Sequence, residues 1–222
     1  MSARDNILGR IRTSLRRADG DGAQALVRAH IEARALSPRP PISGDLVARF
    51  RDNAVRLSST IAEVAHVREA PSAAAAYLRA YDLPLRAVCW PALGGLDWAG
   101  SGVSIEPRPA REPDLVGITE VFCAIAETGT LMTLSGAHTP PVSSLLPETH
   151  IAVLRVSQIV AAMEEAWQRL REVHGAADFM PRAVNFISGP SRTADIEQTL
   201  TFGAHGPYRV HIILVADGGG LL

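Results

Sequence analysis

The stretch NFISGPSRTADIEQTLTFGAHGPYRVHIILV, residues 185–215, decides the fold that the sequence predicts. The apolar residues at its start indicate a short buried strand, and Ser188-Gly189-Pro190 indicates a tight turn after it. A hydroxyl residue followed by acidic residues then predicts a helix that begins at Ser191. Arg209–Val215 is a second apolar strand. The order of strand, loop, helix and strand predicts one βαβ unit of a parallel sheet.

The predicted start of this helix is a candidate anion site. A helix that follows a parallel strand points free backbone N–H groups into the crevice at the carboxyl end of the sheet, and its dipole favours a negative charge. An arginine beside hydroxyl groups would pair well with a carboxylate or a phosphate. The predicted anion-binding residues of this turn are Ser188, Gly189, Ser191, Arg192 and Thr193. The alternative is an ordinary capped turn that binds nothing.

Residues 115–135, LVGITEVFCAIAETGTLMTLS, hold a second group of candidates. Val121–Ala126 is predicted to be a buried strand, and Glu127 follows at its exit. If the strands run parallel, this carboxylate faces the same end of the sheet as the anion loop, where it is a candidate acid, base or nucleophile. Thr128-Gly129 and Thr130 are predicted to help bind the ligand. Equally, Glu127 could stabilise the turn through these threonines and backbone amides.

The composition excludes several classes of protein. The chain has 222 residues and a formal net charge of −1, so it lacks the basic balance that indicates nucleic-acid binding. No apolar run approaches the ~20 residues of a membrane span. The N-terminus lacks an apolar signal core, so we expect a cytoplasmic protein without a membrane span.

Lysine is absent and cysteine is scarce. All 22 basic residues are arginine, which excludes a lysine Schiff base and a Walker-type phosphate lysine. Cys89 and Cys123 lie in separate apolar runs, so we expect two reduced core cysteines. A cubane iron–sulfur cluster needs about four thiolates, so this chain cannot hold one alone. We expect no metal site either, because HExxH and CxxC motifs are absent.

Two parts are predicted along the chain. Residues 1–41 indicate an N-terminal helical appendage that ends in a proline-rich linker. In residues 42–222, short apolar runs alternate with amphipathic stretches, which is typical of an α/β domain with a mainly parallel sheet. Residues 136–149 form a stiff loop that includes His138 and several prolines, and we expect this loop to cover a site.

Four motifs occur in order in the second part. They are AIAETGTL at 124–131, SLLPETHIAVL at 144–154, ISGPSRTADIE at 187–197 and HGPYRVHIIL at 205–214. Together they resemble the LUD-domain family, of the lactate utilization protein C type. The resemblance is strong from Gly117 to Val215. Glu120 departs from the family pattern, which usually has a smaller residue at this position.

The resemblance implies a fold similar to the sugar-phosphate isomerase and CoA-transferase superfamily, a three-layer α/β/α sandwich with a mainly parallel sheet. It also implies a role in oxidising L-lactate to pyruvate beside two partner proteins, at least one of which carries iron–sulfur clusters. This chain would then be the component without clusters, in agreement with its cysteine content.

Three functions stay open at this point. In the first, the chain binds a 2-hydroxy or 2-oxo carboxylate around Ser191-Arg192 within a lactate-oxidising assembly, and a partner holds the electron acceptor because no GxGxxG motif follows a strand. In the second, it is a stand-alone CoA-transferase-like enzyme in which Glu127 attacks an acyl thioester. In the third, it senses a small carboxylate and catalyses nothing.

Lactate oxidation also requires a base, for which a histidine is suited. His205 lies in the loop AHGP and is the candidate catalytic base, beside Glu127. His138 is a further candidate. His150 and His211 lie within predicted strands, where we expect hydrogen-bonded core histidines.

Overall fold

The computed structural model describes residues 2–15, 21–33, 35, 41–174, 180–193 and 201–216. The contacts within the chain divide it into two compact units, Met1–Pro41 and Ile42–Leu222. The first unit contains α1 (Ala3–Ser14) and α2 (Asp21–Ala33). Among the described helices, none combines the length and the apolar character that crossing a membrane requires.

A six-stranded parallel sheet forms the centre of the second unit. Its strands are β1 (Thr60–Val64), β2 (Arg86–Cys89), β3 (Ser104–Pro107), β4 (Val116–Glu120), β7 (Thr149–Arg155) and β12 (Arg209–Val215). They lie in the order β1-β12-β7-β4-β2-β3, and every neighbouring pair is parallel. The inner strands are buried on both faces, as continuous apolar runs predict. The α/β class with a parallel sheet is therefore confirmed.

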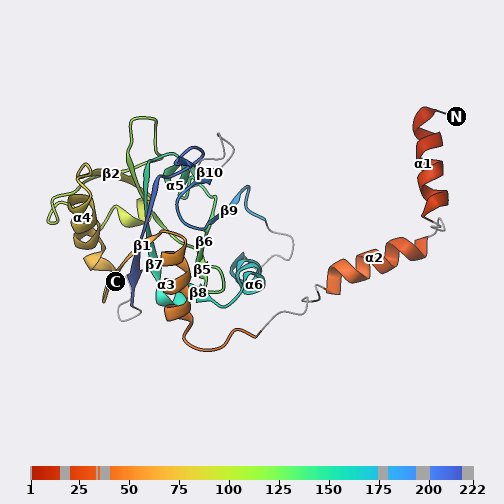
Figure 1. The fold of residues 1–222 in the computed structure, drawn as a ribbon, viewed down its shortest axis with the longest axis horizontal. Helices are drawn as coiled ribbons and strands as arrows, with labels where there is room; N and C mark the ends of the chain where they lie inside the picture. The colour runs from red at the N-terminus through yellow and green to blue at the C-terminus, as the bar shows by residue number, and fades with distance from the viewer. Residues whose placement is uncertain are drawn as a thin grey trace. The chain divides into compact units, whose positions relative to one another are not determined.

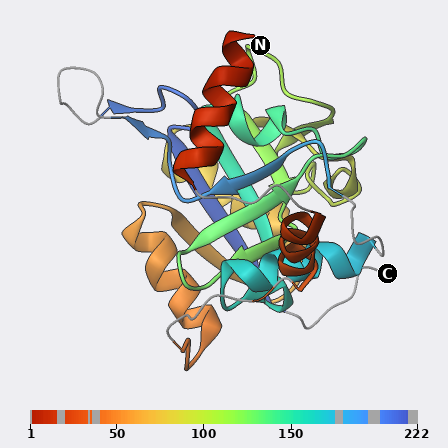
Figure 2. The same cartoon turned by 90° about the vertical axis from the view of Figure 1, so that its right-hand side faces the viewer.

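A second, four-stranded sheet covers one face of the parallel sheet. It consists of β5 (Cys123–Ile125), β6 (Thr130–Leu134), β8 (Ile159–Val160) and β9 (Val184–Ile187), in the order β8-β5-β6-β9. Figure 2 looks onto this second sheet, whose strands cross those of the parallel sheet behind it. The three-layer arrangement expected from the sequence contains no such sheet. The predicted strand Val121–Ala126 is shorter than expected and belongs here rather than to the parallel sheet.

Four helices pack against the two sheets. They are α3 (Leu46–Arg56), α4 (Ala70–Ala80), α5 (Val142–Leu145) and α6 (Met163–His174), with short 3-10 turns η1 (Val67–Glu69), η2 (Pro91–Leu93) and η3 (Val156–Gln158). Figure 1 shows α4 and α6 on opposite sides, with both sheets between them. One core lies between α4 and the parallel sheet, and another lies between the second sheet and α6. A third core fills the space between the sheets, where α3 contributes Phe50 and Ala54.

The predicted βαβ unit is wrong. β9 belongs to the second sheet, where it pairs antiparallel with β6, whereas β12 belongs to the parallel sheet. No helix begins at Ser191, because Arg192–Thr193 forms β10, which pairs antiparallel with β11 (Thr201–Phe202). The backbone of Ser191 bonds Pro207 and Gly203 instead of the next helical turn. Residues 194–200 of the predicted helix lie outside the described residues.

The two cysteines are free and buried, as the sequence predicts. Burial raises the pKa of Cys89 to about 11 and that of Cys123 to about 12, so both thiols stay protonated at neutral pH. His150 and His211 are core residues, which was also predicted. One nitrogen of each ring lies 2.8 Å from a threonine hydroxyl, that of Thr119 or Thr60.

Candidate functional site

The pairing of β6 with β9 brings the two sequence motifs together. Leu131 lies opposite Ile187 in this antiparallel pair, so Thr130, which precedes Leu131, lies beside Ser188, which follows Ile187. The hydroxyl of Thr128 donates to that of Thr130 over 2.8 Å, and the Thr130 hydroxyl lies 2.7 Å from that of Ser188. These three predicted site residues therefore form a chain of hydrogen bonds with one another.

Both predicted site glycines lie against helix α3. Gly129 and Gly189 have φ angles of 67° and 82°, a left-handed conformation that residues with a Cβ atom rarely adopt. A Cβ atom on Gly129 would meet the backbone nitrogen of Ala54, and one on Gly189 would meet the carbonyl oxygen of Leu57. The glycines thus allow α3 to approach both turns closely, which is a structural role.

Glu127 is fixed through its backbone rather than its side chain. The amide of Asn53, on α3, donates to the carbonyl oxygens of Ala126 and Glu127 over 2.8 and 3.0 Å. The backbone N–H of Glu127 donates to the carbonyl oxygen of Ala161 over 3.0 Å. Its carboxylate lies on an exposed residue at the β5–β6 turn. This environment lacks the enclosure that activates a nucleophilic carboxylate.

Arg192 lies at the end of a helix, not at the start of one. Its Nη2 donates to the carbonyl oxygen of Leu57 and to the hydroxyl of Ser58, both over 2.6 Å. Leu57 is the C-cap of α3. A cation at this position satisfies free carbonyl groups and complements the negative end of the helix dipole. The guanidinium also lies 5.4 Å from the ring centre of Phe202. The predicted helix-start geometry of this anion site is therefore wrong, whereas anion binding by Arg192 stays a prediction.

Replacing Arg192 with glutamine is expected to lower the free energy of unfolding by about 1 kcal/mol, because an exposed charge-assisted cap of this kind is modest in strength. Urea denaturation of the purified chain measures the change. The exposed residue Arg182 is a suitable control position, and Arg182→Gln should leave the midpoint nearly unchanged. Equal stability of the Arg192 variant and the parent chain would contradict the capping role.

The remaining predicted residues lie on neighbouring loops. The backbone N–H of His205 donates to the hydroxyl of Ser191 over 3.3 Å, and the His205 side chain is exposed. Thr193 lies in β10. These loops precede β12 and lie beside the chain that enters β1, so they meet at the amino edge of the parallel sheet. The sequence predicted the opposite, carboxyl edge, where open α/β sheets bind ligands.

A cavity of about 470 Å³ lies at that carboxyl edge. Trp90 follows β2, and Glu120 is the last residue of β4. β2 and β4 are neighbours in the sheet, and the chain continues from them in opposite directions, from β2 to β3 and from β4 toward β12. Ligands of doubly wound sheets bind at such a switch point. The cavity is lined by Trp90, Glu120, Val121, Phe122, Leu134, Ser135, Gly136, Thr139, Gln158, Arg169, Val173 and Pro181.

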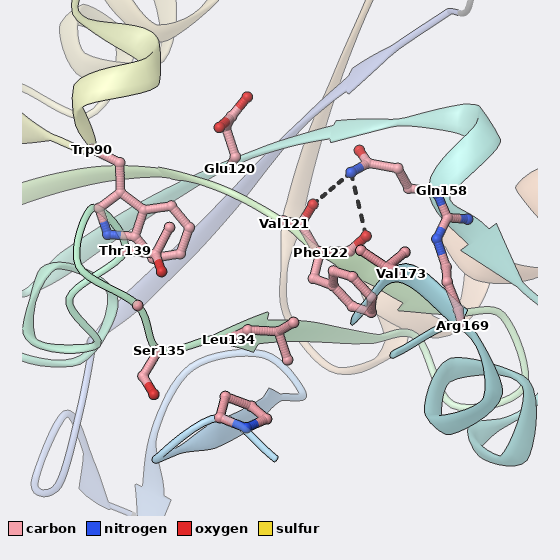
Figure 3. A pocket seen from close by; sticks show the side chains of 12 residues that line it. Trp90, Glu120, Val121, Phe122, Leu134, Ser135, Thr139, Gln158, Arg169 and Val173 are labelled. Atoms are coloured by element: carbon pink, nitrogen blue, oxygen red, sulfur yellow. Dashed lines mark hydrogen bonds between the residues drawn. The ribbon is translucent and has the colours of Figure 1, made fainter. Parts of the chain in front are cut away.

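Hydrogen bonds hold the walls of this cavity in place. The indole N–H of Trp90 donates to the carbonyl oxygen of Pro140 over 3.2 Å. The amide of Gln158 donates to the carbonyl oxygens of Val121 and Phe122 over 2.6 and 3.3 Å. Figure 3 shows Trp90 and Thr139 on one side of the cavity and Arg169 with Gln158 on the other. A largely prebuilt cavity of this size is typical of small-molecule sites.

Three polar groups of the cavity keep free bonding capacity. Arg169 donates to the carbonyl oxygen of Ser157 over 3.0 Å through Nη1, and within the described part of the chain no carboxylate forms an ion pair with it. Neither the carboxylate of Glu120 nor the hydroxyl of Thr139 bonds a described residue. Burial raises the pKa of Glu120, although the charge of Arg155 acts against this. An anion beside Arg169 would meet an open guanidinium.

Most of these residues were missed by the sequence-based prediction. Glu120 was noted only as a departure from the family pattern, and the loop at 136–149 was expected to cover a site, to which it contributes Gly136 and Thr139. Arg169 occupies an ordinary amphipathic helix and carries no local signal. Among the residues that the structure describes, no group of three or more His, Cys, Asp or Glu side chains could hold a metal ion.

The structure is of the α/β class, with a cavity at the switch point of a parallel sheet. Residues 115–215 match the LUD domain, so the resemblance of the sequence motifs to that family is confirmed. This matched range includes β4, β6 and α6, which supply much of the cavity wall.

Curated relatives carry the name lactate utilization protein C. The chain is 39% identical to the protein of an Exiguobacterium species over 124 residues, which are 54% of this chain and 53% of the relative. It is 36% identical to that of Bacillus subtilis over 129 residues, which are 58% and 54% of the two chains. The chain therefore spans about half the length of the curated relatives it matches.

A solved structure is also similar to this chain. It is a DUF162 family protein from Deinococcus radiodurans, with a TM-score of 0.56 and 25% sequence identity. The match covers 79% of this chain and 99% of the other. The similarity thus extends well beyond the motifs and includes most of the second unit.

Proposed function

We propose that this chain is the component without iron–sulfur clusters of a system that oxidises L-lactate to pyruvate, and that it binds a small carboxylate. Its relatives named lactate utilization protein C support the system. The observation that carries the binding role is the cavity at the switch point, where Arg169 has no carboxylate partner among the described residues. Partner proteins would carry the clusters and accept the electrons, because two buried cysteines cannot hold a cubane cluster.

This proposal places the carboxylate at the cavity rather than around Ser191-Arg192. The guanidinium of Arg192 already bonds the end of α3, whereas that of Arg169 faces an open cavity. Acyl transfer by Glu127 has less support, because this residue is exposed in a turn. A relation of the parallel sheet to the sugar-phosphate isomerase and CoA-transferase superfamily remains part of the proposal, and the all-parallel strand order supports it.

Deletion of the gene for this chain tests the role in its own host. The deletion strain should lose growth on L-lactate as the only carbon source and should keep growth on pyruvate, which enters metabolism after the oxidation. A plasmid copy of the parent chain should restore growth. Unchanged growth of the deletion strain on L-lactate, in a host without a second lactate-oxidising system, would refute the role.

A further inference from the structure

The cavity at the carboxyl edge is larger and more apolar than lactate needs. Its volume of about 470 Å³ is in the range that holds ligands well above the size of a three-carbon acid. Pyruvate would occupy a small part of it. The rest of the space therefore has to hold either water or a longer side chain of the ligand.

The arrangement of the walls distinguishes these possibilities. Charged and polar groups lie at Arg169, Glu120 and Thr139, whereas the ring of Trp90 and the side chains of Phe122 and Leu134 provide an apolar surface. Trp90 is only 4% exposed and its indole N–H is already bonded to Pro140, so its ring has no polar group left for water. An apolar surface of this kind favours a hydrocarbon group over water.

We infer that this cavity binds a 2-oxo or 2-hydroxy carboxylate with a branched or aromatic side chain larger than the methyl group of lactate. Arg169 pairs with the carboxylate, and the hydrocarbon end lies against Trp90 and Leu134. Only the choice of a 2-oxo or 2-hydroxy acid rests on the proposed function; the size and the polarity of the ligand rest on the cavity.

The chemistry of each wall agrees with this ligand. Arginine binds a carboxylate in a bidentate manner, and its Nη2 and Nε are not used by any bond to a described residue.

Isothermal titration calorimetry with defined probes tests the inference. We expect 4-methyl-2-oxopentanoate to bind the purified chain at least tenfold more tightly than pyruvate, because each additional buried methylene group contributes about 0.8 kcal/mol. The uncharged analogue 4-methylpentan-2-one should bind at least tenfold more weakly than the acid, because it cannot pair with Arg169. Equal affinity for pyruvate and the longer acid, or no binding of either, would overturn the inference.

Two variants on helix α6 provide the matched comparison. Arg169→Gln should weaken binding of 4-methyl-2-oxopentanoate at least thirtyfold (an estimate of about 2 kcal/mol for a charge-assisted pair). Arg171→Gln should leave it unchanged, because two residues along a helix correspond to roughly 200° of rotation and place Arg171 on another face. Circular dichroism confirms that both variants are folded. Equal affinity of the two variants would overturn the role of Arg169.

A third variant tests whether the ligand binds in the cavity or at the loop around Arg192, which the sequence predicted as the site. If Arg192→Gln abolished binding while Arg169→Gln kept it, the ligand would bind at the amino edge, and the inference would be refuted. The growth test of the proposed function is independent of this outcome. Suppose that the deletion strain cannot grow on L-lactate and that a plasmid copy of the Arg169→Gln variant restores its growth fully. The proposed function would then stand, and the cavity would be rejected as its site.

Discussion

Acidification from about pH 7.5 to about pH 5 is expected to remove about 4 kcal/mol from the free energy of unfolding. Burial lowers the pKa of both His150 and His211 from 6.5 to about 4. In the unfolded chain both rings take up a proton below their ordinary pKa, whereas in the folded chain they stay neutral until about pH 4. The unfolded state therefore binds more protons in this interval, and stability falls as the pH falls.

The structure explains why the folded protein resists this protonation. His150 is fully buried and lies 2.8 Å from the Thr119 hydroxyl through Nε2, and its Nδ1 has no partner among the described residues. His211 is 4% exposed and stacks on Tyr77 with 3.9 Å between ring centres. A charge on either ring would lie in an apolar core, where no described carboxylate bonds it.

Other titrating groups change the result little in this interval. Pairing with Arg108 lowers the pKa of Asp114, so its contribution is lost only at still lower pH. Glu120 acts in the opposite direction, because its raised pKa favours the folded state as the pH falls. Glu120 is partly exposed, so solvent screens its effect and the two histidines dominate.

Urea denaturation of the parent chain and of His211→Phe, at both pH values, measures this effect. Phenylalanine keeps a ring against Tyr77 but cannot take up a proton, so the pH-dependent loss should fall to about half, or about 2 kcal/mol. A loss of stability that is equal at both pH values cancels in this comparison. A parent chain with equal stability at the two pH values would contradict the account of the histidines.

Replacing Gly189 with alanine is expected to lower the free energy of unfolding by about 4 kcal/mol, from a backbone cost of about 1–2 kcal/mol and an overpacking cost of about 1–3 kcal/mol. Its φ is 82°, and an added Cβ would meet the carbonyl oxygen of Leu57 at the end of α3. A backbone atom cannot move aside as the end of a flexible side chain can. The variant would have to shift α3 away from the turn.

Gly44 provides the matched control for this substitution. Its φ is 92°, and an added Cβ would meet no atom within 4 Å. Gly44→Ala should therefore show only the backbone cost, about 1–2 kcal/mol. Urea denaturation of both variants separates the contact with α3 from the backbone cost. Equal losses in the two variants would show that close packing against α3 contributes nothing.

The strands of the parallel sheet were predictable where the apolar run was continuous. Arg209–Val215 is such a run, and it forms β12 with the predicted bounds. β4 was missed although it lies at the centre of the sheet, because Gly117 and Thr119 interrupt its apolar pattern. Gly117 is needed because helix α5 lies directly above it, where an added Cβ would meet the carbonyl oxygen of Ser143. Sequence alone does not reveal this contact.

The predicted helix at Ser191 failed for a similar reason. A hydroxyl residue before acidic residues is a sound local signal for a helix start. Contacts distant in sequence override it, because Arg192 bonds the end of α3, and the backbone of Ser191 bonds Pro207 and Gly203. Local propensity is a weak guide wherever tertiary bonds of this kind are available.

The candidate site residues show the same limit of local sequence patterns. The motif residues Thr128, Thr130 and Ser188 do meet, but they bond one another. The walls of the cavity come from the end of β2, from β4 and β6, and from α6, so they combine three separate parts of the sequence. The packing of the second sheet and of α6 against the parallel sheet brings them together, and apart from the loop at 136–149 no local motif indicated them.

A crystal structure of the chain with 4-methyl-2-oxopentanoate tests the central claim most directly. We predict that the acid lies in the cavity at the carboxyl ends of β2 and β4, with both carboxylate oxygens within hydrogen-bond distance of the Arg169 guanidinium and the branched end against Trp90. A ligand bound beside Arg192 at the amino edge of the sheet, or a carboxylate turned away from Arg169, would contradict it.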